Sequence, residues 1–587
     1  MLRRPLLVSS IVTSASLLAY APASPGAPAL VAAPSVSTIP PIPVAPVPNA
    51  CARFKPGAVV HNPPALFSVN GVLNVRFSYQ QTTDSAGRLL HCFMTPGGLQ
   101  DPTLHVKPGD TLKVTVTNNT PASPLGEIFN PPNCGDDQVE FTPPDSSGNF
   151  AGSATNIHYH GTNVTPQCHG DNVTKTIINS GTTFQYSFTF PTDEPSGLYW
   201  YHPHIHGLAE RDVLGGAAGA LIVDGIQNTQ PAVSGHRHRV IVIRDQPQVD
   251  GLDEGPGNCG VDVPFQDISV NYVPIDSHQD SFGNVTFTPA VLRMMKGETQ
   301  FWRITNSTAD TILELQAIYD GVPQTLQIVG VDAVPVNSQD GTQPGTLIPV
   351  THFRLPPAAR VEFLVKAPAP SVKVAQLVTN NVNTGPDGDC DPTRAIFNIA
   401  LASNIVADGG TDDLLPATTA LSTTQQRFGG MASQPVSTTR TFQFSEIQPS
   451  AFFITQVSAG EQPHVFDNNQ PPSVVTTQGA VEKWIVQNIA QENHEFHMHQ
   501  IHFLVLSQDN FEINGSQQAP AINGQYLDMI EVPFWDNVAN PNGPVPQVQL
   551  LMNFEGMDVG DFVYHCHILG HEDLGMMAII RIQAPTP

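Results

Sequence analysis

Four short clusters of histidine could bind metal ions. Ten of the 21 histidines fall into these clusters. The clusters are His158-Tyr159-His160, His202-Pro203-His204, His494 with His497 and His499, and His565-Cys566-His567 followed by His571 and Met576. Residues i and i+2 of a β-strand point to the same side, so each His-x-His pair can present two imidazoles to one metal centre. Imidazole ligands suit copper or zinc.

The number of pairs indicates a centre with more than one ion. Four pairs supply eight imidazoles, which is too many for one ion and fits a cluster of about three. Two pairs lie in the first half of the chain and two near its end, so they would meet if these parts face each other. A structural zinc site closes with four ligands and would explain one pair. Packing would explain one or two histidines, not ten.

The last cluster also indicates a second kind of site. If residues 565–567 are extended, Cys566 points away from the side that His565 and His567 face. His494 precedes His497 by an odd step of three, so it can point to the cysteine side. His571 and Met576 follow in the next loop. Two histidines, a cysteine and an axial methionine form the ligand set of a blue-copper electron-transfer site, which covalent bonds would connect to the cluster.

The remaining histidines do not fit this pairing. His206 and His502 lie beside the clusters but break the spacing, so we expect them to pack against or support the ligands. His91, His105 and His169 are expected on the surface or in loops.

One strand pattern recurs along the chain and indicates tandem domains. Each copy starts at Gly and ends at Asn nine residues later, at Gly109–Asn118, Gly297–Asn306 and Gly479–Asn488. In the first copy Leu112, Val114 and Val116 alternate with polar residues, which is the period of a half-buried strand. The copies are too far apart for a solenoid repeat. A histidine phrase follows the outer two copies, at Gly197–His204 and Gly560–His567, and is missing from the middle one.

Length and composition agree with several all-β domains. The chain has 587 residues, and at roughly 150 residues per domain this corresponds to about three or four. Gly (46) and Pro (55) are abundant and only 13% of residues are charged, which favours strands and frequent turns. We therefore expect three β-sandwich domains. Their predicted bounds are 50–230, 231–405 and 440–587, with a linker or long loop at 406–439.

The N-terminus is typical of an exported protein. Arg3 and Arg4 form a charged start, and an apolar run with small residues suited to cleavage follows. We predict a signal peptide at 1–24, a Pro- and Ala-rich tether at 25–49 and a periplasmic or secreted location. An uncleaved anchor is the alternative, but the run is short for a membrane span, and no other stretch could cross a bilayer. The general and twin-arginine export routes both stay open.

Seven cysteines in an exported chain leave one without a disulfide partner. Cys566, between two histidines, is the odd one. The other six allow fifteen pairings, among which nearness in the chain favours Cys51–Cys92, Cys134–Cys168 and Cys259–Cys390.

The histidine and cysteine motifs resemble those of the multicopper oxidases, most closely the bacterial, laccase-like, three-domain branch. The resemblance covers nearly all of the mature chain. It implies tandem cupredoxin-like Greek-key domains and four copper ions, one type 1, one type 2 and two type 3. It also implies an oxidase that removes electrons singly from phenols or aromatic amines and reduces O2 to water.

The resemblance further assigns the ligands, motif by motif. The type 1 copper would be bound by His494, Cys566, His571 and Met576. The type 2 copper would be bound by His158 and His497, the first histidines of their pairs. The type 3 coppers would be bound by His160, His202, His204, His499, His565 and His567. Electrons would travel from Cys566 through His565 or His567. An axial Met, rather than Leu or Phe, implies a lower potential for the type 1 copper.

Two acids match the proton-delivery positions of this family. Glu572 directly follows His571, and Asp171 lies 11 residues after His160. Reduction of O2 to water consumes four protons, so a positioned carboxylate relay is chemically needed. The alternative is that both acids are ordinary surface groups or orient imidazoles.

Other functions remain to be weighed. A metal-ion oxidase acting on Cu(I), Fe(II) or Mn(II) would need acids or Met near His571, and the 11 Met of this chain form no Met-rich insert. A copper-sequestering protein would not need a connected electron path, and a nitrite reductase would leave the type 3 pairs unexplained. The net charge of −26 excludes a basic nucleic-acid surface, and the oligomeric state stays open.

Overall fold

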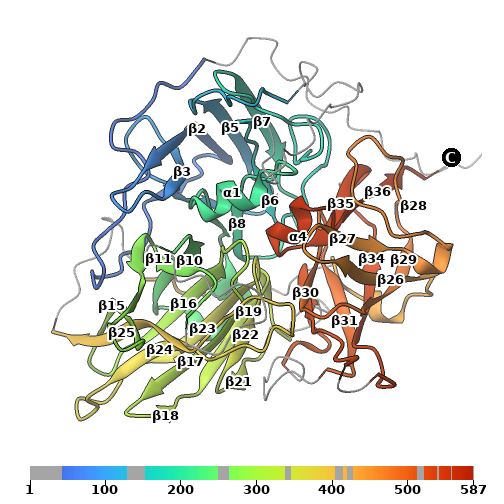
Figure 1. The fold of residues 1–587 in the computed structure, drawn as a ribbon. Helices are drawn as coiled ribbons and strands as arrows, with labels where there is room; N and C mark the ends of the chain where they lie inside the picture. Colours follow the sequence, from blue (N-terminus) through green and yellow to red (C-terminus); the bar gives the residue numbers. More distant parts are fainter. Residues whose placement is uncertain are drawn as a thin grey trace, which may run out of the picture. The chain divides into compact units, whose positions relative to one another are not determined.

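The computed structural model describes residues 42–128, 152–248, 263–337, 345–403, 414–418, 427–511, 521–538, 541–556 and 558–585. Within these ranges the chain is nearly all strand, with short helices (Figure 1), so the predicted all-β fold is confirmed. The helices are α1 (Ala209–Leu214), α2 (Ile226–Thr229) and α4 (Leu569–Asp573), and 3-10 turns lie at Pro231–Val233, Met431–Ser433 and Val457–Ala459. No helix of the described residues is long and apolar enough to cross a membrane.

The first sheet group is built from residues 65–223 and forms a two-layer sandwich. One sheet has the order β1 (Ala65–Phe67), β4 (Thr103–Val106), β9 (Gly219–Val223), β8 (Gly197–His202) and β6 (His158–His160). The other has the order β3 (Leu89–Met94), β2 (Val72–Thr83), β5 (Thr111–Asn118) and β7 (Thr183–Thr189). Side chains such as Val75, Val114, Leu104 and Tyr199 fill the space between the layers.

The second sheet group is built from residues 237–402. Its larger sheet has the order β12 (Val273–Ile275), β11 (Asp267–Val270), β10 (Arg237–Gln246), β16 (Thr299–Asn306), β23 (Arg360–Lys366), β19 (Leu326–Val331) and β20 (Val334–Pro335), with β21 (Ile348–Val350) on β19. The facing sheet has the order β15 (Ala290–Met295), β25 (Arg394–Ala402), β24 (Ala375–Thr379), β17 (Leu313–Tyr319) and β18 (Val322–Pro323), with β22 (Phe353–Leu355) on β17. A hairpin pairs β13 (Ser277–Gln279) with β14 (Val285–Phe287).

The third sheet group is built from residues 438–583. One sheet has the order β27 (Ala451–Thr455), β26 (Thr438–Ile447), β29 (Val481–Asn488), β34 (Gln547–Asn553), β31 (Phe503–Asp509) and β32 (Tyr526–Leu527). The other has the order β28 (Val474–Thr477), β36 (Met577–Gln583), β35 (Gly560–Cys566), β30 (His494–Met498) and β33 (Met529–Val532). The three groups follow the order of the predicted domains, whose boundaries we keep as a proposal.

The recurring sequence pattern occupies the same place in each sheet group. Strands β5, β16 and β29 each pair in parallel with the first long strand of their group, and antiparallel with a later one. The glycines that open them, Gly109, Gly297 and Gly479, all have a positive φ of +74° to +85°, a conformation that favours glycine.

The asparagine that ends each copy explains why this residue recurs. Its side-chain amide donates to two backbone carbonyls in every group. Asn118 bonds Ser153 and Ile178, Asn306 bonds Thr311 and Leu355, and Asn488 bonds Glu492 and Val532, at 2.7–2.9 Å. All three asparagines are buried, so each satisfies carbonyls that would otherwise lack partners.

Segments outside the sheets also pack against them. The predicted signal peptide lies outside the described residues, but Val44, in the predicted tether, is buried and its N–H donates to Thr117 at 2.7 Å. In the predicted linker, Arg427 pairs with Asp193 at 3.2 Å and Phe428 stacks on Tyr526. The described parts of both segments are therefore attached to the sandwiches.

The cysteines follow the prediction where the structure describes them. Cys51 and Cys92 form a disulfide, and Cys566 is buried and free. Cys168 and Cys390 are also disulfide-bonded, while Cys134 and Cys259 lie outside the described residues.

The expectation that His91 and His105 lie on the surface or in loops was wrong. Both are buried on strands β3 and β4. His169 does lie in a turn, stacked on Phe184.

Candidate metal centre

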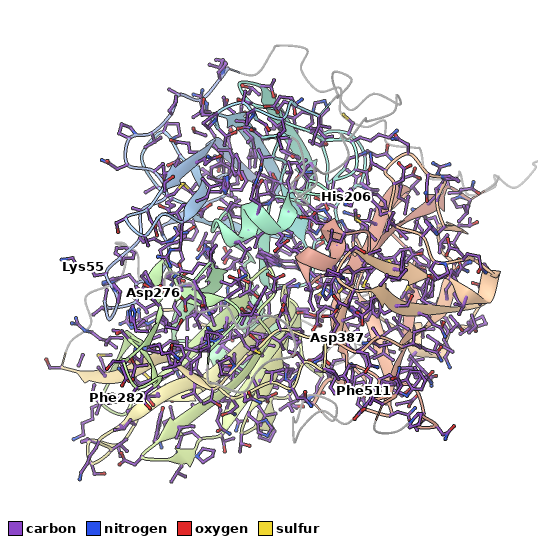
Figure 2. The ribbon with its side chains drawn as sticks, in the orientation of Figure 1. Lys55, His206, Asp276, Phe282, Asp387 and Phe511 are labelled. Carbon is purple, nitrogen blue, oxygen red and sulfur yellow. A yellow bond between two sulfur atoms is a disulfide. The ribbon has the colours of Figure 1, made fainter. Side chains whose placement is uncertain are left out.

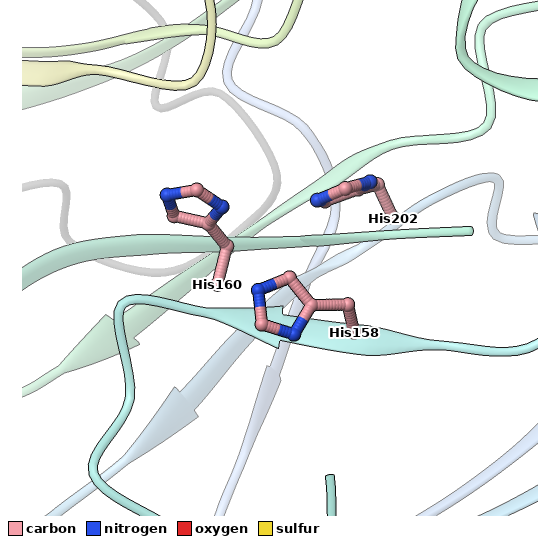
Figure 3. Close-up of side chains that lie close together, drawn as sticks. All are labelled: His158, His160 and His202. Carbon is pink, nitrogen blue, oxygen red and sulfur yellow. The ribbon is translucent and has the colours of Figure 1, made fainter. Parts of the chain in front are cut away.

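The paired histidines of the first and third sheet groups meet at one place. On β6 and β8, His158 lies opposite His202, and Figure 3 shows these two rings and His160 turned toward one another. On β30 and β35, His497 lies opposite His565. Across the two groups, His158 stacks on His499 with ring centres 3.8 Å apart, and His160 stacks on His497 at 3.9 Å.

The remaining pairs complete the cluster. The Nε2 atoms of His204 and His499 each lie 3.2 Å from Nε2 of His565. The ring of His567 lies 5.1 Å from that of His160 and 5.4 Å from that of His202. Eight imidazoles therefore surround one buried space, as the sequence predicts, and residues from chain positions more than 300 apart contribute to it.

One nitrogen of several rings lacks a partner although it is buried. These atoms are Nε2 of His158, His202 and His497 and Nδ1 of His160. The opposite nitrogens are engaged: Nδ1 of His202 donates to the Pro203 carbonyl at 2.8 Å and Nδ1 of His497 to the Asp528 carbonyl at 2.8 Å. A neutral imidazole that carries its proton on one ring nitrogen has a lone pair on the other. The buried nitrogens without partners are therefore the ones that can bind a metal.

Burial keeps these imidazoles neutral, which is the form that binds metal. It lowers the pKa of His202 to about 3 and that of His565 to about 4. The pKa of His158 falls well below its usual range because of burial and then the neighbouring rings of His204 and His202.

A second group of donors lies on the other side of β35. The Cys566 Sγ lies 3.7 Å from Nδ1 of His494 and 3.8 Å from Nδ1 of His571, and the two Nδ1 atoms are 3.2 Å apart. Met576 is buried, and its carbonyl accepts the N–H of Cys566 at 3.0 Å. His565 and His567 face the eight-histidine cluster, whereas Cys566 between them faces this second group of donors. The alternation of side chains along β35 therefore places neighbouring residues on opposite sides of the strand.

Two carboxyl groups predicted as proton-relay residues touch the histidine cluster. Asp171 accepts from Nδ1 of His158 at 2.9 Å and from Gln500 Nε2 at 2.6 Å, and burial raises its pKa to about 7. Glu572 Oε2 lies 3.3 Å from Nδ1 of His565, and Oε1 lies 3.5 Å from Nδ1 of His204. Burial, and then the charge of Asp573, raises the pKa of Glu572 well above its usual range.

The two unpaired histidines beside the clusters have other contacts. His206, labelled in Figure 2, packs edge-on against Phe466 with ring centres 5.0 Å apart. His502 Nε2 donates to the Asp332 carbonyl at 3.0 Å. These contacts agree with the supporting role expected of both.

The sequence did not single out four further residues near these sites. Asp528 lies 3.2 Å from His160 and is held by Arg360 of the second sheet group. Glu492 lies 3.3 Å from Nε2 of His571, and Glu446 lies 3.6 Å from Nε2 of His494. Only Glu492 could have been found, because it stands two residues before a histidine cluster; the others have no motif or spacing that connects them to a ligand.

Fold and site together define a protein of β-sandwiches with eight buried histidines between the first and third sheet groups and a buried histidine and cysteine site within the third. Two family models described as multicopper oxidase match residues 147–228 and 433–585, the segments that hold all four histidine clusters. A laccase of Bacillus subtilis is 23% identical over 86% of this chain and 94% of its own length. A multicopper oxidase LPR1 homolog of Oryza sativa is 24% identical over 73% of this chain and 84% of its own length.

Solved structures agree with these relatives in fold. The McoA multicopper oxidase of Aquifex aeolicus has a TM-score of 0.62 at 18% identity and covers 90% of this chain, with 99% of its own length matched. A multicopper oxidase of Campylobacter jejuni described as a metallo-oxidase has a TM-score of 0.58 at 20% identity, covering 90% and 96%.

Two segments of the chain thus match multicopper oxidase models, and the relatives that cover most of the chain are a multicopper oxidase and a laccase. The sandwiches of the chain are cupredoxin-like domains, and the chain is an oxidoreductase. These matches to multicopper oxidases imply copper as cofactor, with O2 and a small reducing molecule as substrates. The donors fit copper, because buried imidazole nitrogens without partners and a buried thiol are ligands that copper prefers.

Proposed function

We propose that the chain is a four-copper oxidase of the laccase type, which oxidises phenols or aromatic amines one electron at a time and reduces O2 to water. The observation that carries this proposal is the tripeptide His565-Cys566-His567, whose cysteine belongs to one group of donors and whose histidines belong to the other. A protein that only stores copper does not need such a connection. A nitrite reductase does not need the eight-histidine cluster.

The ligand assignment is part of this proposal. His494, Cys566, His571 and Met576 would hold the type 1 copper. His158 and His497 would hold the type 2 copper, and His160, His202, His204, His499, His565 and His567 the type 3 pair. Copper bound there would supply one-electron redox chemistry and stabilise charge on reduced oxygen.

The chain's own residues would divide the remaining tasks. His571 is 7% exposed, whereas His494 and Cys566 are fully buried, so a donor would approach the type 1 ligands through His571. Phe452 stacks on the His571 ring at 4.2 Å and fixes its orientation. Glu572 would hold a proton between Nδ1 of His565 and Nδ1 of His204, and Asp171 would hold one beside Nδ1 of His158.

One observation favours a second candidate, a metal-ion oxidase acting on Cu(I), Fe(II) or Mn(II). Glu492 and Glu446 lie beside the outer nitrogens of His571 and His494, and Gln448 donates to Glu492 at 2.8 Å. Burial, and then a hydrogen bond with Glu446, raises the pKa of Glu492, so the pair shares a proton that a bound cation would displace. Acids at this edge are what a cationic donor would require.

Oxygen uptake by the copper-loaded protein tests the proposal. We expect uptake with a phenol, measured in parallel with Cu(I), Fe(II) and Mn(II), and none with the copper-free protein. Absence of uptake with every donor would refute an oxidase. Uptake with metal ions alone would replace the laccase-type proposal by the second candidate.

Substitution of the acidic pair separates the two candidates. If Glu492 and Glu446 bind a metal-ion donor, Glu492→Gln should lower kcat/KM for that ion by about tenfold, the loss expected for one charged contact. The value for a phenol should change less than twofold, because phenols need no negative charge. Glu555→Gln, at an exposed position, is the matched control. An equal loss for both donors would show that Glu492 acts on His571 and not on the donor.

A further inference from the structure

Asp528 makes contacts with histidines of both halves of the cluster. It lies between strands β32 and β33 and is fully buried. Its Oδ1 lies 3.2 Å from Nε2 of His160, and its backbone carbonyl accepts Nδ1 of His497 at 2.8 Å. Its Oδ2 lies 3.5 Å from Nε2 of His502. Asp528, a residue of the third sheet group, therefore contacts His160 of the first group and His497 of the third group.

The carboxylate of Asp528 is itself held from the second sheet group. Arg360, on β23, donates from Nη1 to Oδ1 at 2.6 Å and from Nη2 to Oδ2 at 2.5 Å. The same guanidinium donates from Nε to the Leu198 carbonyl on β8 at 3.2 Å. Asp332 accepts the backbone N–H groups of Arg360 and Met529 and completes the connection among the three groups.

Gly161 leaves the space that this pair occupies. A Cβ on Gly161 would lie 2.4 Å from Arg360 Nη2 and 2.4 Å from Asp528 Oδ2. Gly161 also has a φ of +82°, which favours glycine. Any larger residue at position 161 would therefore clash with the Arg360–Asp528 ion pair beside His160.

The contact with Asp528 explains an asymmetry among the ligands. His202 and His497 leave Nε2 without a partner, whereas His160 leaves Nδ1. For Nδ1 of His160 to carry a lone pair, Nε2 must carry the proton and needs an acceptor, which Asp528 supplies. A buried carboxylate is costly unless it is paired, and Arg360 pairs with both of its oxygens.

We propose that Asp528 and Arg360 are a positioning pair, which fixes the tautomer and ring orientation of His160 and the orientation of His497 toward the copper cluster. This rests on the proposed function, because it presupposes copper between these rings. The second sheet group, which contributes none of the proposed ligands, then sets the geometry of the cluster through Arg360. Loss of such an outer partner lowers metal affinity by about ten- to a hundredfold.

The decisive variant removes both charges. Asp528→Asn with Arg360→Met removes both charges of the pair, whereas Asp528→Asn alone would leave the buried Arg360 without the carboxylate that binds both of its terminal nitrogens. Asp332, whose Oδ1 lies 3.6 Å from Arg360 Nη1, loses that partner in the double variant but keeps the backbone N–H groups of residues 360 and 529. The matched control is Arg303→Met with Glu362→Gln, an ion pair on strands β16 and β23 that is equally buried and touches none of the proposed ligands. The readouts are copper content, copper affinity against a chelator, the electron paramagnetic resonance spectrum and the thermal midpoint.

We expect the Asp528/Arg360 variant to bind cluster copper about ten- to a hundredfold more weakly and to show an altered type 2 resonance, while the blue type 1 absorption is kept. The control variant should keep the wild-type copper affinity, type 2 resonance and blue absorption. A merely structural role would lower the thermal midpoint of both variants and leave the resonance unchanged, which would overturn the proposal. If neither Asp528 variant folds, Arg360→Lys decides, because it keeps the charge but cannot hold both carboxylate oxygens; a wild-type resonance would then overturn the proposal.

Different results would refute the proposed function and the positioning pair. If the wild-type chain binds no copper cluster, the proposed function is refuted. If it binds the cluster and the double variant matches it in copper affinity and resonance, only the positioning pair is refuted.

Discussion

Replacement of Cys566 by serine should abolish the blue colour and lower oxidase turnover by about a thousandfold or more, the scale of losing an indispensable catalytic group. Cys566 Sγ lies within 3.8 Å of Nδ1 of both His494 and His571, and it is the one sulfur donor on the main-chain path to His565 and His567. A serine hydroxyl of similar size does not provide the soft thiolate ligand that blue copper requires. Absorption in the visible range and oxygen uptake with a phenol measure the two effects.

The same variant should keep most of the copper in the eight-histidine cluster. None of those rings uses the sulfur, since Cys566 lies on the opposite side of β35 from them. Met576→Leu is the control at the same site, because it removes only the axial ligand; it should keep the blue colour and the turnover while raising the potential. Oxidase activity retained in Cys566→Ser would overturn the connection between the two sites.

The candidate ligands could be proposed from the sequence, because the pattern that brings them together is local. Residues i and i+2 of a strand share a side, so His158 and His160 had to face together and Cys566 had to face away from His565. This depends only on the segments being extended, and strands β6 and β35 are. The recurring Gly-to-Asn pattern was equally local, and its asparagines perform the same task in each sheet group.

Contacts between distant segments left no such signal. Arg360 and Asp528 are 168 residues apart, and neither stands in a motif. The middle sandwich lacks the histidine phrase, yet its Arg360 binds Asp528, the partner of His160. His91 and His105 were misplaced for the same reason: a lone histidine has no periodicity, so its burial depends on which element covers it.

The acids next to the site show how far a resemblance to known proteins can lead. Glu572 and Asp171 were predicted as relay residues because they match the proton-delivery positions of the multicopper oxidases, and both contact imidazoles of the cluster. Their depth could not be predicted, because α4 and the turn at Asp171 are covered by other segments. That depth matters for their chemistry, since burial raises the pKa of both carboxyl groups and thereby lets them hold protons at neutral pH.

Replacement of Glu572 by glutamine should lower turnover by about a hundredfold to ten-thousandfold, the usual contribution of a positioned proton donor. Glu572 is fully buried, neither of its oxygens has a hydrogen-bond partner within the described residues, and these oxygens lie 3.3 Å and 3.5 Å from the Nδ1 atoms of His565 and His204. Glutamine has the same shape and can still accept from those rings, but it cannot release a proton. The change should therefore remove proton delivery while leaving ligand orientation intact.

Reduction of the protein by the phenol and its reoxidation by O2 can be measured separately. The two rates distinguish proton delivery by Glu572 from orientation of the ligands. With a phenol in the absence of O2, bleaching of the blue colour should proceed at the wild-type rate in Glu572→Gln, because the proposed donor approach is at His571, whereas the Glu572 carboxyl lies against His565 and His204. Recovery of the colour after O2 is added should be slow, and slower still in D2O. Asp171→Asn provides the comparison for the second acid, at Nδ1 of His158. If Glu572→Gln recovers its colour at the wild-type rate, the carboxyl only orients His565 and His204, because a group that merely orients can be replaced by an amide whereas a proton donor cannot.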